Sequence, residues 1–269
     1  MKIYKALTIA GSDTSGGAGL EADLKTFQEF GIYGMAAITV IVAQNPHNNW
    51  SHDIYPLPLT ALAAQLDTVL TGIGVDALKT GMLATSDIIE LVAQKIDQSS
   101  VKQIVIDPVL ACKGTDEPLN PDSAEAIKTV LAPRATLITP NVFEAKILSG
   151  LKTLTTLDDL QEAAQRIYEL GAKNVLIKGG AKLETEDAID LFYDGKNYTV
   201  LRSPKLVTTY NHGAGCTYAA AVTAGLAKGA NMLTSAQAAK DFTYAAIKNG
   251  FPINQYVGPV WHGASRLCK

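Results

Sequence analysis

Short runs of apolar residues alternate along this chain with amphipathic stretches, and this alternation limits the possible folds more than any other feature. The runs contain few polar side chains, which is typical of strands covered by helices on both faces of a sheet. The stretches between them place apolar side chains three and four residues apart, as with Leu20, Leu24 and Phe27, which predicts helices. Strands are predicted at residues 6–10, 36–43, 77–80, 103–107, 136–139 and 175–178, and helices at 19–30, 59–70, 86–96, 122–131, 143–148, 157–170, 215–227 and 235–248.

The alternation of strands and helices predicts an α/β fold, with a mainly parallel central sheet between two layers of helices. Two further β-rich runs, residues 189–193 and 198–202, flank Asp194-Gly195. Because Asp-Gly favours a tight turn, we expect a small hairpin at one edge of the sheet. No repeat or low-complexity segment interrupts the pattern, so we expect one domain covering residues 1–269.

The composition excludes several classes of protein. Lys and Arg number 23, Asp and Glu number 26, the net charge is −3, and 47% of the residues are hydrophobic. Such a chain is not intrinsically disordered, and without a basic excess we expect no nucleic-acid partner. No apolar run reaches the length of about 18 residues that spans a membrane, and residues 6–10 are too short for a signal-peptide core. We therefore expect no membrane partner and a cytoplasmic location.

The first glycine-rich segment, residues 11–19, connects the first predicted strand to the first predicted helix. Ligands of open parallel sheets bind beyond the C-terminal ends of the strands, so this position suits a binding site. The spacing of the glycines matches neither a Walker A motif nor G-x-G-x-x-G. A flexible turn between strand and helix, without a binding role, is the alternative explanation. Asp13 favours a site, because a carboxylate there can hydrogen-bond a substrate hydroxyl or ring group.

A second glycine-rich segment, residues 212–217, opens a predicted helix of small residues. Glycines at a helix start expose backbone N–H groups, which form an anion site together with the helix dipole. Cys216 lies in the first turn, where the pKa of a thiol is lowered. The alternative is a glycine-rich helix start with a cysteine that packs as a small apolar residue. The spacing does not decide between the two.

Polar residues follow three other predicted strands. Asp107 ends one strand, Asn141 and Glu144 follow the next, and Lys178 ends a third. Asn141 and Glu144 could serve only as helix caps, and Lys178 could be a solvated turn residue. Together, however, carboxylates for magnesium, a lysine for phosphate and an anion site match phosphoryl transfer, which depends on positioning and charge neutralisation.

These motifs resemble the ribokinase superfamily, and within it the vitamin-kinase branch of hydroxymethylpyrimidine/phosphomethylpyrimidine kinases and related bacterial pyridoxal kinases. The resemblance covers essentially the whole chain and rests on residues 10–13, 15–19, 22–26, 79–83, 107–109, 139–144, 178–180 and 212–217. It implies a ribokinase-like three-layer α/β/α fold, ATP and Mg²⁺ as cofactors, a vitamin as the small-molecule substrate, and a homodimer.

The resemblance also implies roles for individual residues. The residues that would bind the vitamin ring are Gly11, Asp13, Gly19, Gln44, Met82 and Val109. An anion hole for the transferred phosphoryl group would consist of Gly213, Ala214 and Gly215. The residues that would bind ATP are Lys178, Asn141, Thr209 and Gly213, and those that would hold magnesium and its waters are Asp107 and Glu144.

The three cysteines form no C-x-x-C pair, which argues against a zinc site, and their number argues against a disulfide scaffold. Most of the superfamily has Asp as the catalytic base where this chain has Cys216. A cysteine base occurs in the vitamin-kinase branch, and the resemblance implies that the Cys216 thiolate would deprotonate the substrate hydroxymethyl group. Cys112 resembles the second cysteine of pyridoxal kinases that carry two. A role for it is chemically reasonable, because a thiol adds reversibly to the aldehyde of pyridoxal and forms a hemithioacetal. A loop cysteine without a covalent role is the alternative, and Cys268 is expected to be a bystander.

We therefore expect an ATP-dependent kinase that phosphorylates the hydroxymethyl group of pyridoxal, and also pyridoxine and pyridoxamine, giving pyridoxal 5′-phosphate in vitamin B6 salvage. The alternative is a hydroxymethylpyrimidine/phosphomethylpyrimidine kinase of thiamine biosynthesis, with which Gln44 is also compatible. A non-catalytic vitamin or nucleotide binder fits less well, because Cys216 and Lys178 are both present. His47 and His52 are expected in a solvated polar loop, and His212 is expected to support the glycine turn.

Overall fold

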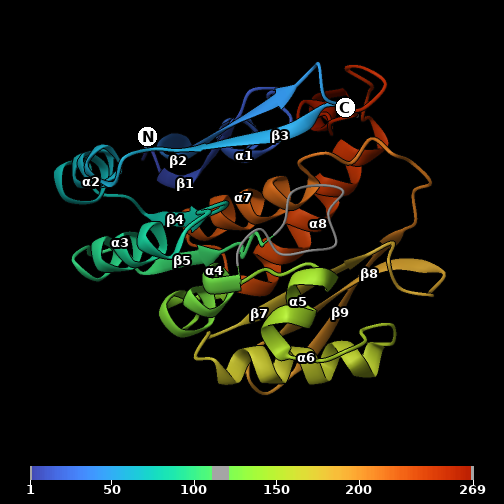
Figure 1. Cartoon of the computed structure of the whole chain (residues 1–269). Coiled ribbons are helices and arrows are strands. Elements are labelled where there is room, and N and C mark those ends of the chain that lie inside the picture. Colours follow the sequence, from blue (N-terminus) through green and yellow to red (C-terminus); the bar gives the residue numbers. More distant parts are fainter. Residues whose placement is uncertain (1, 111–120, 268–269) are drawn as a thin grey trace.

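The sheet at the centre of the molecule has nine strands in the part of the chain that the computed structural model describes, residues 2–110 and 121–267. Their order is β3-β2-β1-β4-β5-β6-β7-β8-β9 (Figure 1). The strands are β1 (Lys5–Asp13), β2 (Tyr33–Asn45), β3 (Ser51–Pro56), β4 (Ala77–Thr80), β5 (Gln103–Ile106), β6 (Leu137–Ile138), β7 (Val175–Gly180), β8 (Asp187–Tyr193) and β9 (Tyr198–Pro204).

The six inner strands are parallel to one another, namely β2, β1, β4, β5, β6 and β7 in their order across the sheet. At one edge β8 pairs antiparallel with β7 and with β9, and at the other edge β3 pairs antiparallel with β2. The β8–β9 hairpin confirms the prediction from Asp194-Gly195, because the Asp194 carboxylate accepts hydrogen bonds from the backbone N–H groups of Lys196 and Asn197 and so closes the turn. The mainly parallel sheet with an edge hairpin is therefore as expected.

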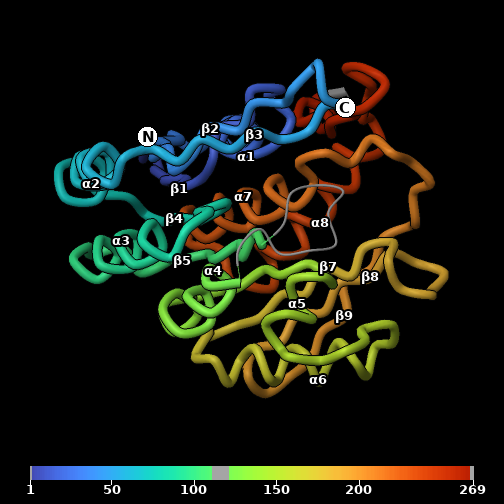
Figure 2. The backbone as a smooth tube through the Cα atoms, viewed as in Figure 1, coloured from blue at the N-terminus to red at the C-terminus, as the bar shows by residue number. Residues whose placement is uncertain are grey.

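Helices cover both faces of the sheet, as Figures 1 and 2 show. One layer consists of α1 (Gly19–Glu29), α7 (Ala214–Ala227) and α8 (Met232–Lys248), with the short α9 (Ala264–Leu267) beside α1. The other layer consists of α2 (Leu59–Leu66), α3 (Ser86–Asp97), α4 (Pro121–Ala126), α5 (Val142–Ser149) and α6 (Leu157–Glu169). Two shorter stretches continue α2 and α4 as π-helical segments, Asp67–Ile73 and Ile127–Leu131.

The core follows the alternation of side chains along each strand. In β4, Leu78 packs into the apolar cluster under α2 to α6, whereas Ala77 packs with Ala220 and Ala224 of α7 on the opposite face. Both sets of side chains are fully buried, which explains why the strands are mostly apolar rather than alternating.

The antiparallel strand β3 was not predicted, and the expectation of a solvated loop around His52 was wrong. β2 runs two residues beyond its predicted end and turns back, so that Gln44 pairs with His52. The sequence of β3, Ser-His-Asp-Ile-Tyr-Pro, has no apolar alternation because the strand is half exposed at the edge of the sheet. Besides the backbone ladder to β2, Asn45 Nδ2 donates to Asp53 Oδ2 at 3.1 Å across the pair.

Within the described residues, no helix combines the length and the apolar character that crossing a membrane requires.

Candidate active site

The main cavity, of about 860 Å³, lies at the C-terminal ends of the parallel strands. Thr209 is exposed and does not line it, and Cys112 lies outside the described residues. All the other predicted site residues meet there, namely Gly11, Asp13, Gly19, Gln44, Met82, Asp107, Val109, Asn141, Glu144, Lys178, Gly213, Ala214, Gly215 and Cys216.

Asp13 is the centre of a hydrogen-bond network at one end of this cavity. One carboxylate oxygen accepts from Gln44 Nε2 at 2.5 Å, and the other accepts from His212 Nε2 at 2.7 Å. Backbone N–H groups of Ser15 and Ala18 complete the network. Burial alone would raise the pKa of Asp13, but the bonds from His212 and Gln44 outweigh it and hold the pKa well below its usual range. This end of the cavity therefore carries a fixed carboxylate.

Two histidines at the same end were not among the predicted site residues. His52 lines the cavity opposite Gln44 in the β2–β3 pairing, and burial lowers its pKa. Only the register of the unpredicted hairpin places it there. The backbone of His212 bonds Gly258 and Val260, directly before the glycine turn that His212 is expected to support. Its side-chain bond to Asp13 was missed, although its place directly before the glycines was a usable signal.

The second glycine-rich segment forms a tight turn at the start of α7. Gly213 has a φ of +81°, and a Cβ there would lie 1.9 Å from the Gly17 carbonyl oxygen, so only glycine fits. Thr217 Oγ1 donates to the Gly213 carbonyl oxygen at 2.8 Å and fixes the turn. Residues 213–216 of this turn line the cavity, and although the Ala214 N–H donates to the Asn211 carbonyl oxygen at 3.1 Å, a helix start of this kind suits an anion.

Cys216 faces the cavity from this turn and is half-buried. The expectation that its pKa is lowered was wrong for the site without ligands. Burial raises the pKa of the thiol to about 12, and the positive charge of Lys79 and the backbone N–H of Gly19 reverse this effect only in part. The helix start is therefore not enough to ionise the thiol near neutral pH.

At the other end of the cavity, Lys178 and Asp107 form a buried ion pair, with Nζ and Oδ1 2.6 Å apart. Burial lowers the pKa of Lys178, but Asp107 and Glu144 more than compensate and raise it, so the ammonium stays charged. Thr139 Oγ1 also bonds Asp107 at 3.2 Å. The structure thus presents Lys178 as a fixed cation rather than a solvated turn residue.

Asn141 and Glu144 cap α5, as the capping interpretation predicts, and they also line the cavity, so their roles toward ATP and magnesium stay predictions. The Asn141 side chain accepts from the Glu144 N–H at 2.9 Å, and the Glu144 carboxylate accepts from the Asn141 N–H at 2.8 Å. Burial raises the pKa of Glu144 to about 7, which Lys178 opposes and Asp107 reinforces. The carboxylate therefore ionises near neutral pH.

The described residues contain no cluster of three or more histidine, cysteine, aspartate or glutamate side chains arranged as a metal cage. Asp107 and Glu144 nevertheless supply the hard oxygen donors that Mg²⁺ prefers. Mg²⁺ is usually held by one or two carboxylates and by substrate phosphates, so this donor set fits a magnesium ion that arrives with a nucleotide.

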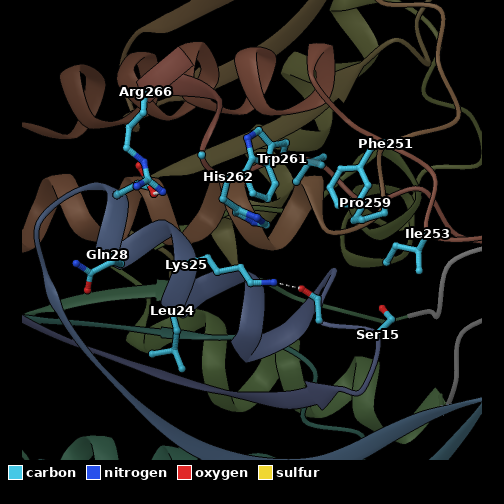
Figure 3. A pocket seen from close by; sticks show the side chains of 14 residues that line it. Ser15, Leu24, Lys25, Gln28, Phe251, Ile253, Pro259, Trp261, His262 and Arg266 are labelled. Carbon is cyan, nitrogen blue, oxygen red and sulfur yellow. Dashed lines mark hydrogen bonds and ion pairs between the residues drawn. The ribbon is translucent and has the colours of Figure 1, made fainter. Parts of the chain in front are cut away.

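A second cavity, of about 480 Å³, lies between α1 and the C-terminal segment 251–266 (Figure 3). His262, which is 5% exposed, lines it and also contacts the first turn of α7, because its Nε2 lies 2.9 Å from Thr217 Oγ1. Lys25 spans the cavity wall and donates to the Gly16 carbonyl oxygen at 2.5 Å. The second cavity therefore adjoins the back of the turn that holds Cys216.

The comparisons with known proteins agree with this geometry. Residues 13–261 match the family model described as phosphomethylpyrimidine kinase. The chain belongs to this family. It is 57% identical to a pyridoxine kinase of Bacillus subtilis (strain 168) over 99% of this chain and 98% of that protein. It is 44% identical to a hydroxymethylpyrimidine/phosphomethylpyrimidine kinase of the same organism, over 98% and 96% of the two chains.

Solved structures of the family confirm the expected three-layer fold. The ADP complex of Bacillus subtilis pyridoxal kinase superposes with a TM-score of 0.96 at 57% identity, over 99% of this chain and all of that one. Staphylococcus aureus pyridoxal kinase in complex with AMP-PCP and pyridoxal gives a TM-score of 0.91 at 47% identity, over 98% and 95% of the chains.

Proposed function

We propose that the chain is an ATP-dependent kinase that transfers a phosphoryl group to the hydroxymethyl group of pyridoxal, and also of pyridoxine and pyridoxamine, in vitamin B6 salvage. One observation carries the proposal. A single cavity holds a hydrogen-bonding end at Asp13, a cationic end at Lys178 and an anion turn between them, in a chain 57% identical to a pyridoxine kinase. The pyrimidine kinase alternative is less well supported, since the relative with that activity is 44% identical.

The Asp13 end of the cavity suits the vitamin ring. Asp13 and Gln44 are already bonded to each other, so the polar groups that meet the ring are fixed before it binds. Met82 and Val42 supply apolar walls beside them. A pocket of mostly apolar surface with a few fixed polar groups is typical of small-molecule sites. We infer that the ring binds here with its hydroxymethyl group toward Cys216 at the start of α7.

The Lys178 end suits the phosphates of ATP. Its ammonium and the N–H groups of the Gly213–Gly215 turn lie on one cavity wall, where negative charge develops as the phosphoryl group moves. Magnesium, when bound, would supply further positive charge to the phosphates, and Asp107 and Glu144 would hold it. Lys178 and the turn orient the phosphate chain and keep it in line with the attacking hydroxyl.

In the proposed transfer, the hydroxymethyl oxygen forms a bond to the γ-phosphorus, the bond between this phosphorus and the ADP oxygen breaks, and the hydroxyl proton passes to the Cys216 thiolate. The thiolate is a minor form near neutral pH, because burial raises the pKa of this thiol to about 12. Activity is therefore expected to rise with pH in the range where the enzyme is stable.

Cys112 lies outside the described residues, and we propose a second role for it. Its sulfur would add to the aldehyde carbon of pyridoxal while the thiol proton moves to the aldehyde oxygen, giving a reversible hemithioacetal. Pyridoxine has no aldehyde, so the two substrates separate this role from general effects on the site.

We also infer a homodimer and a cytoplasmic location. Exposed apolar side chains on the β2–β3 hairpin, Ile41 at 44% and Tyr55 at 58%, support a contact between copies. Cys216 is proposed to act as a free thiol, and thiols stay reduced in the cytoplasm. Light scattering of the purified protein tests the dimer, and a monomer at micromolar concentration contradicts it.

The experiment that tests the function compares kcat/KM for pyridoxal, pyridoxine and hydroxymethylpyrimidine, with the wild type and Cys112→Ala. Pyridoxal should be the best substrate, and Cys112→Ala should reduce its kcat/KM far more than that of pyridoxine. A clear preference for the pyrimidine contradicts the substrate, and equal losses for pyridoxal and pyridoxine contradict the hemithioacetal. Cys216→Ala should abolish transfer to every substrate, and substantial turnover by this variant contradicts the role of Cys216 as base.

A further inference from the structure

Lys79 is a charged residue in the short, fully buried strand β4, whose other residues are Ala77, Leu78 and Thr80. Its ammonium lies 2.9 and 3.1 Å from the two carboxylate oxygens of Asp23 in α1. Thr8 of β1 donates to the same carboxylate at 2.6 Å. All three residues are completely buried. The ion pair therefore lies inside the molecule, between the sheet and the α1–α7 layer.

Such a pair is a weak way to stabilise a fold. Removing two charges from water costs about as much as their attraction returns, and apolar side chains of the same volume often serve as well or better. Ala77 of β4 and Ala220 of α7, on the same face of the sheet, are apolar, and the polar groups beside Lys79 are those of Asp23 and Thr8. Packing alone does not explain the charge, so its position relative to the active site matters.

Lys79 lies directly behind the wall of the main cavity. Gly81 lines that cavity, and a Cβ placed on Gly81 would lie 3.3 Å from Lys79 Nζ. The ammonium is thus separated from the cavity by little more than the backbone of Gly81.

The same face of α7 carries Cys216. Residues four apart lie on one face of a helix, so Cys216 lies in line with Ala220 and Ala224. Those two alanines pack against Ala77, and Lys79 points to the same side of β4, two residues closer to the cavity. Cys216 and Lys79 therefore lie at the same level, across the contact between α7 and β4.

We propose that Lys79 is a positioning residue whose buried ammonium, held in place by Asp23, supplies the positive charge beside which the Cys216 thiolate forms. This inference rests on the proposed function, in which Cys216 accepts the proton of the substrate hydroxyl. It explains why a strand in the core keeps a lysine and why that lysine has a dedicated carboxylate partner.

Four charged groups act on the Cys216 thiol from the elements around it. Lys79 from β4 lowers its pKa, whereas Asp23 from α1 and Asp107 after β5 raise it, and the charge of Lys178 from β7 is coupled to it as well. Among the groups that lower the pKa, Lys79 has the largest effect, ahead of the backbone N–H of Gly19. Asp23 raises the pKa of the Cys216 thiol by less than Lys79 lowers it. The Lys79–Asp23 pair as a whole therefore favours the thiolate.

The test measures the thiolate directly and needs no activity. The full-length protein, without substrates, is treated with iodoacetamide at several pH values between 7 and 9.5, and alkylation of the peptide that contains Cys216 is followed by mass spectrometry. In Lys79→Met/Asp23→Asn, which removes both charges together, we expect alkylation severalfold slower than in the wild type at each pH, because the variant loses the larger effect of Lys79, which lowers the pKa of the thiol, together with the smaller opposing effect of Asp23.

The matched control is a buried lysine–aspartate pair that does not line the main cavity, Lys240 and Asp190, whose Nζ and Oδ2 lie 2.7 Å apart between α8 and β8. Lys240→Met/Asp190→Asn should leave the alkylation rate of Cys216 within about twofold of the wild type. If the double variant at Lys79 does not fold, Lys79→Met alone serves, because an unpaired buried Asp23 becomes neutral by taking up a proton.

Equal alkylation rates in the wild type and the Lys79 variants, with circular dichroism showing a native fold, overturn the inference. So does the same slowing in the Lys240 control. These outcomes are independent of the proposed function, which fails separately if the wild type does not phosphorylate pyridoxal.

Discussion

His212 Nε2 lies 2.7 Å from Asp13 Oδ2, although 199 positions separate the two residues. This bond joins the first glycine-rich segment to the turn at the start of α7. Gly17 packs on the same imidazole so closely that a Cβ there would lie 2.6 Å from His212 Cδ2. The end of the cavity proposed for the vitamin ring and the turn proposed for the phosphoryl group are therefore held together by one side-chain contact.

Asp13→Asn should lower both stability and kcat/KM for pyridoxal. The pKa of Asp13 in the folded protein lies below its ordinary value of 3.8, so this carboxylate stabilises the fold above about pH 4, and the contribution is lost as pH falls further. Urea unfolding should show a loss of about 2 kcal/mol at pH 7 that shrinks below pH 4. A difference between variant and wild type that does not change with pH contradicts this account.

Gly213→Ala should destroy the anion turn. The residue has a φ of +81°, and its new Cβ would meet the Gly17 carbonyl oxygen at 1.9 Å, so the backbone must move. We expect a kcat/KM loss of at least about a hundredfold, typical of losing an oxyanion-type donor. Gly229→Ala is the matched control, since Gly229 has a φ of +83° with no atom within 4 Å of its Cβ, and should cost only about 1 kcal/mol of stability. Similar activity losses in both variants would show that backbone strain alone is responsible.

Most of the fold follows from local patterns in the sequence. Buried parallel strands are apolar on both faces, and this property made β4 recognisable at its observed bounds, Ala77–Thr80. β3 escaped detection because an exposed edge strand needs no apolar pattern. His52 escaped with it, since its place beside Gln44 depends on the register of that hairpin.

The candidate site was predictable to a similar extent. The glycine-rich turns and the polar residues at the strand ends are short-range features, and the topology of a parallel sheet brings them together. The state of Cys216 was not predictable, because it depends on burial and on Lys79, two features of the packed molecule. The position of Cys216 at a helix start indicated only one of the several influences on its pKa.

Glu144→Gln should stabilise the nucleotide-free protein increasingly as pH rises from 5 to 8. The folded-state pKa of about 7 lies above the ordinary value of 4.5, so between those values the carboxyl is neutral in the folded protein but ionised in the unfolded chain, and the wild type loses stability as pH rises through this range. Glutamine keeps an oxygen that can accept from the Asn141 N–H and preserves the cap. The measurement is the free energy of unfolding of variant and wild type at pH 5, 6, 7 and 8.

The control for this prediction is Asp159, which caps α6 in the same way. Backbone N–H groups of Thr155 and Thr156 lower its pKa, so it is ionised in both folded and unfolded chains above pH 5. Asp159→Asn should therefore change stability by the same amount at every pH from 5 to 8. A pH-independent effect of Glu144→Gln would mean that the buried carboxyl is not held in its neutral form.

His262→Gln should remove a distinct part of the acid sensitivity of the fold. Burial lowers the pKa of His262 to about 4 from an ordinary value of 6.5, so the neutral ring stabilises the fold above pH 6.5, and this contribution is lost as pH falls from 6.5 to 4. The loss amounts to roughly 3 kcal/mol over that range. Glutamine can still donate to Thr217 Oγ1 from the wall of the second cavity (Figure 3), so the turn at Gly213 should be kept.

Urea unfolding between pH 7 and 4 should give a flatter profile of unfolding free energy against pH for His262→Gln than for the wild type. The control His47→Gln, at an exposed histidine, should follow the wild type. Parallel profiles for the wild type and His262→Gln would show that the ring takes up its proton without cost to the fold.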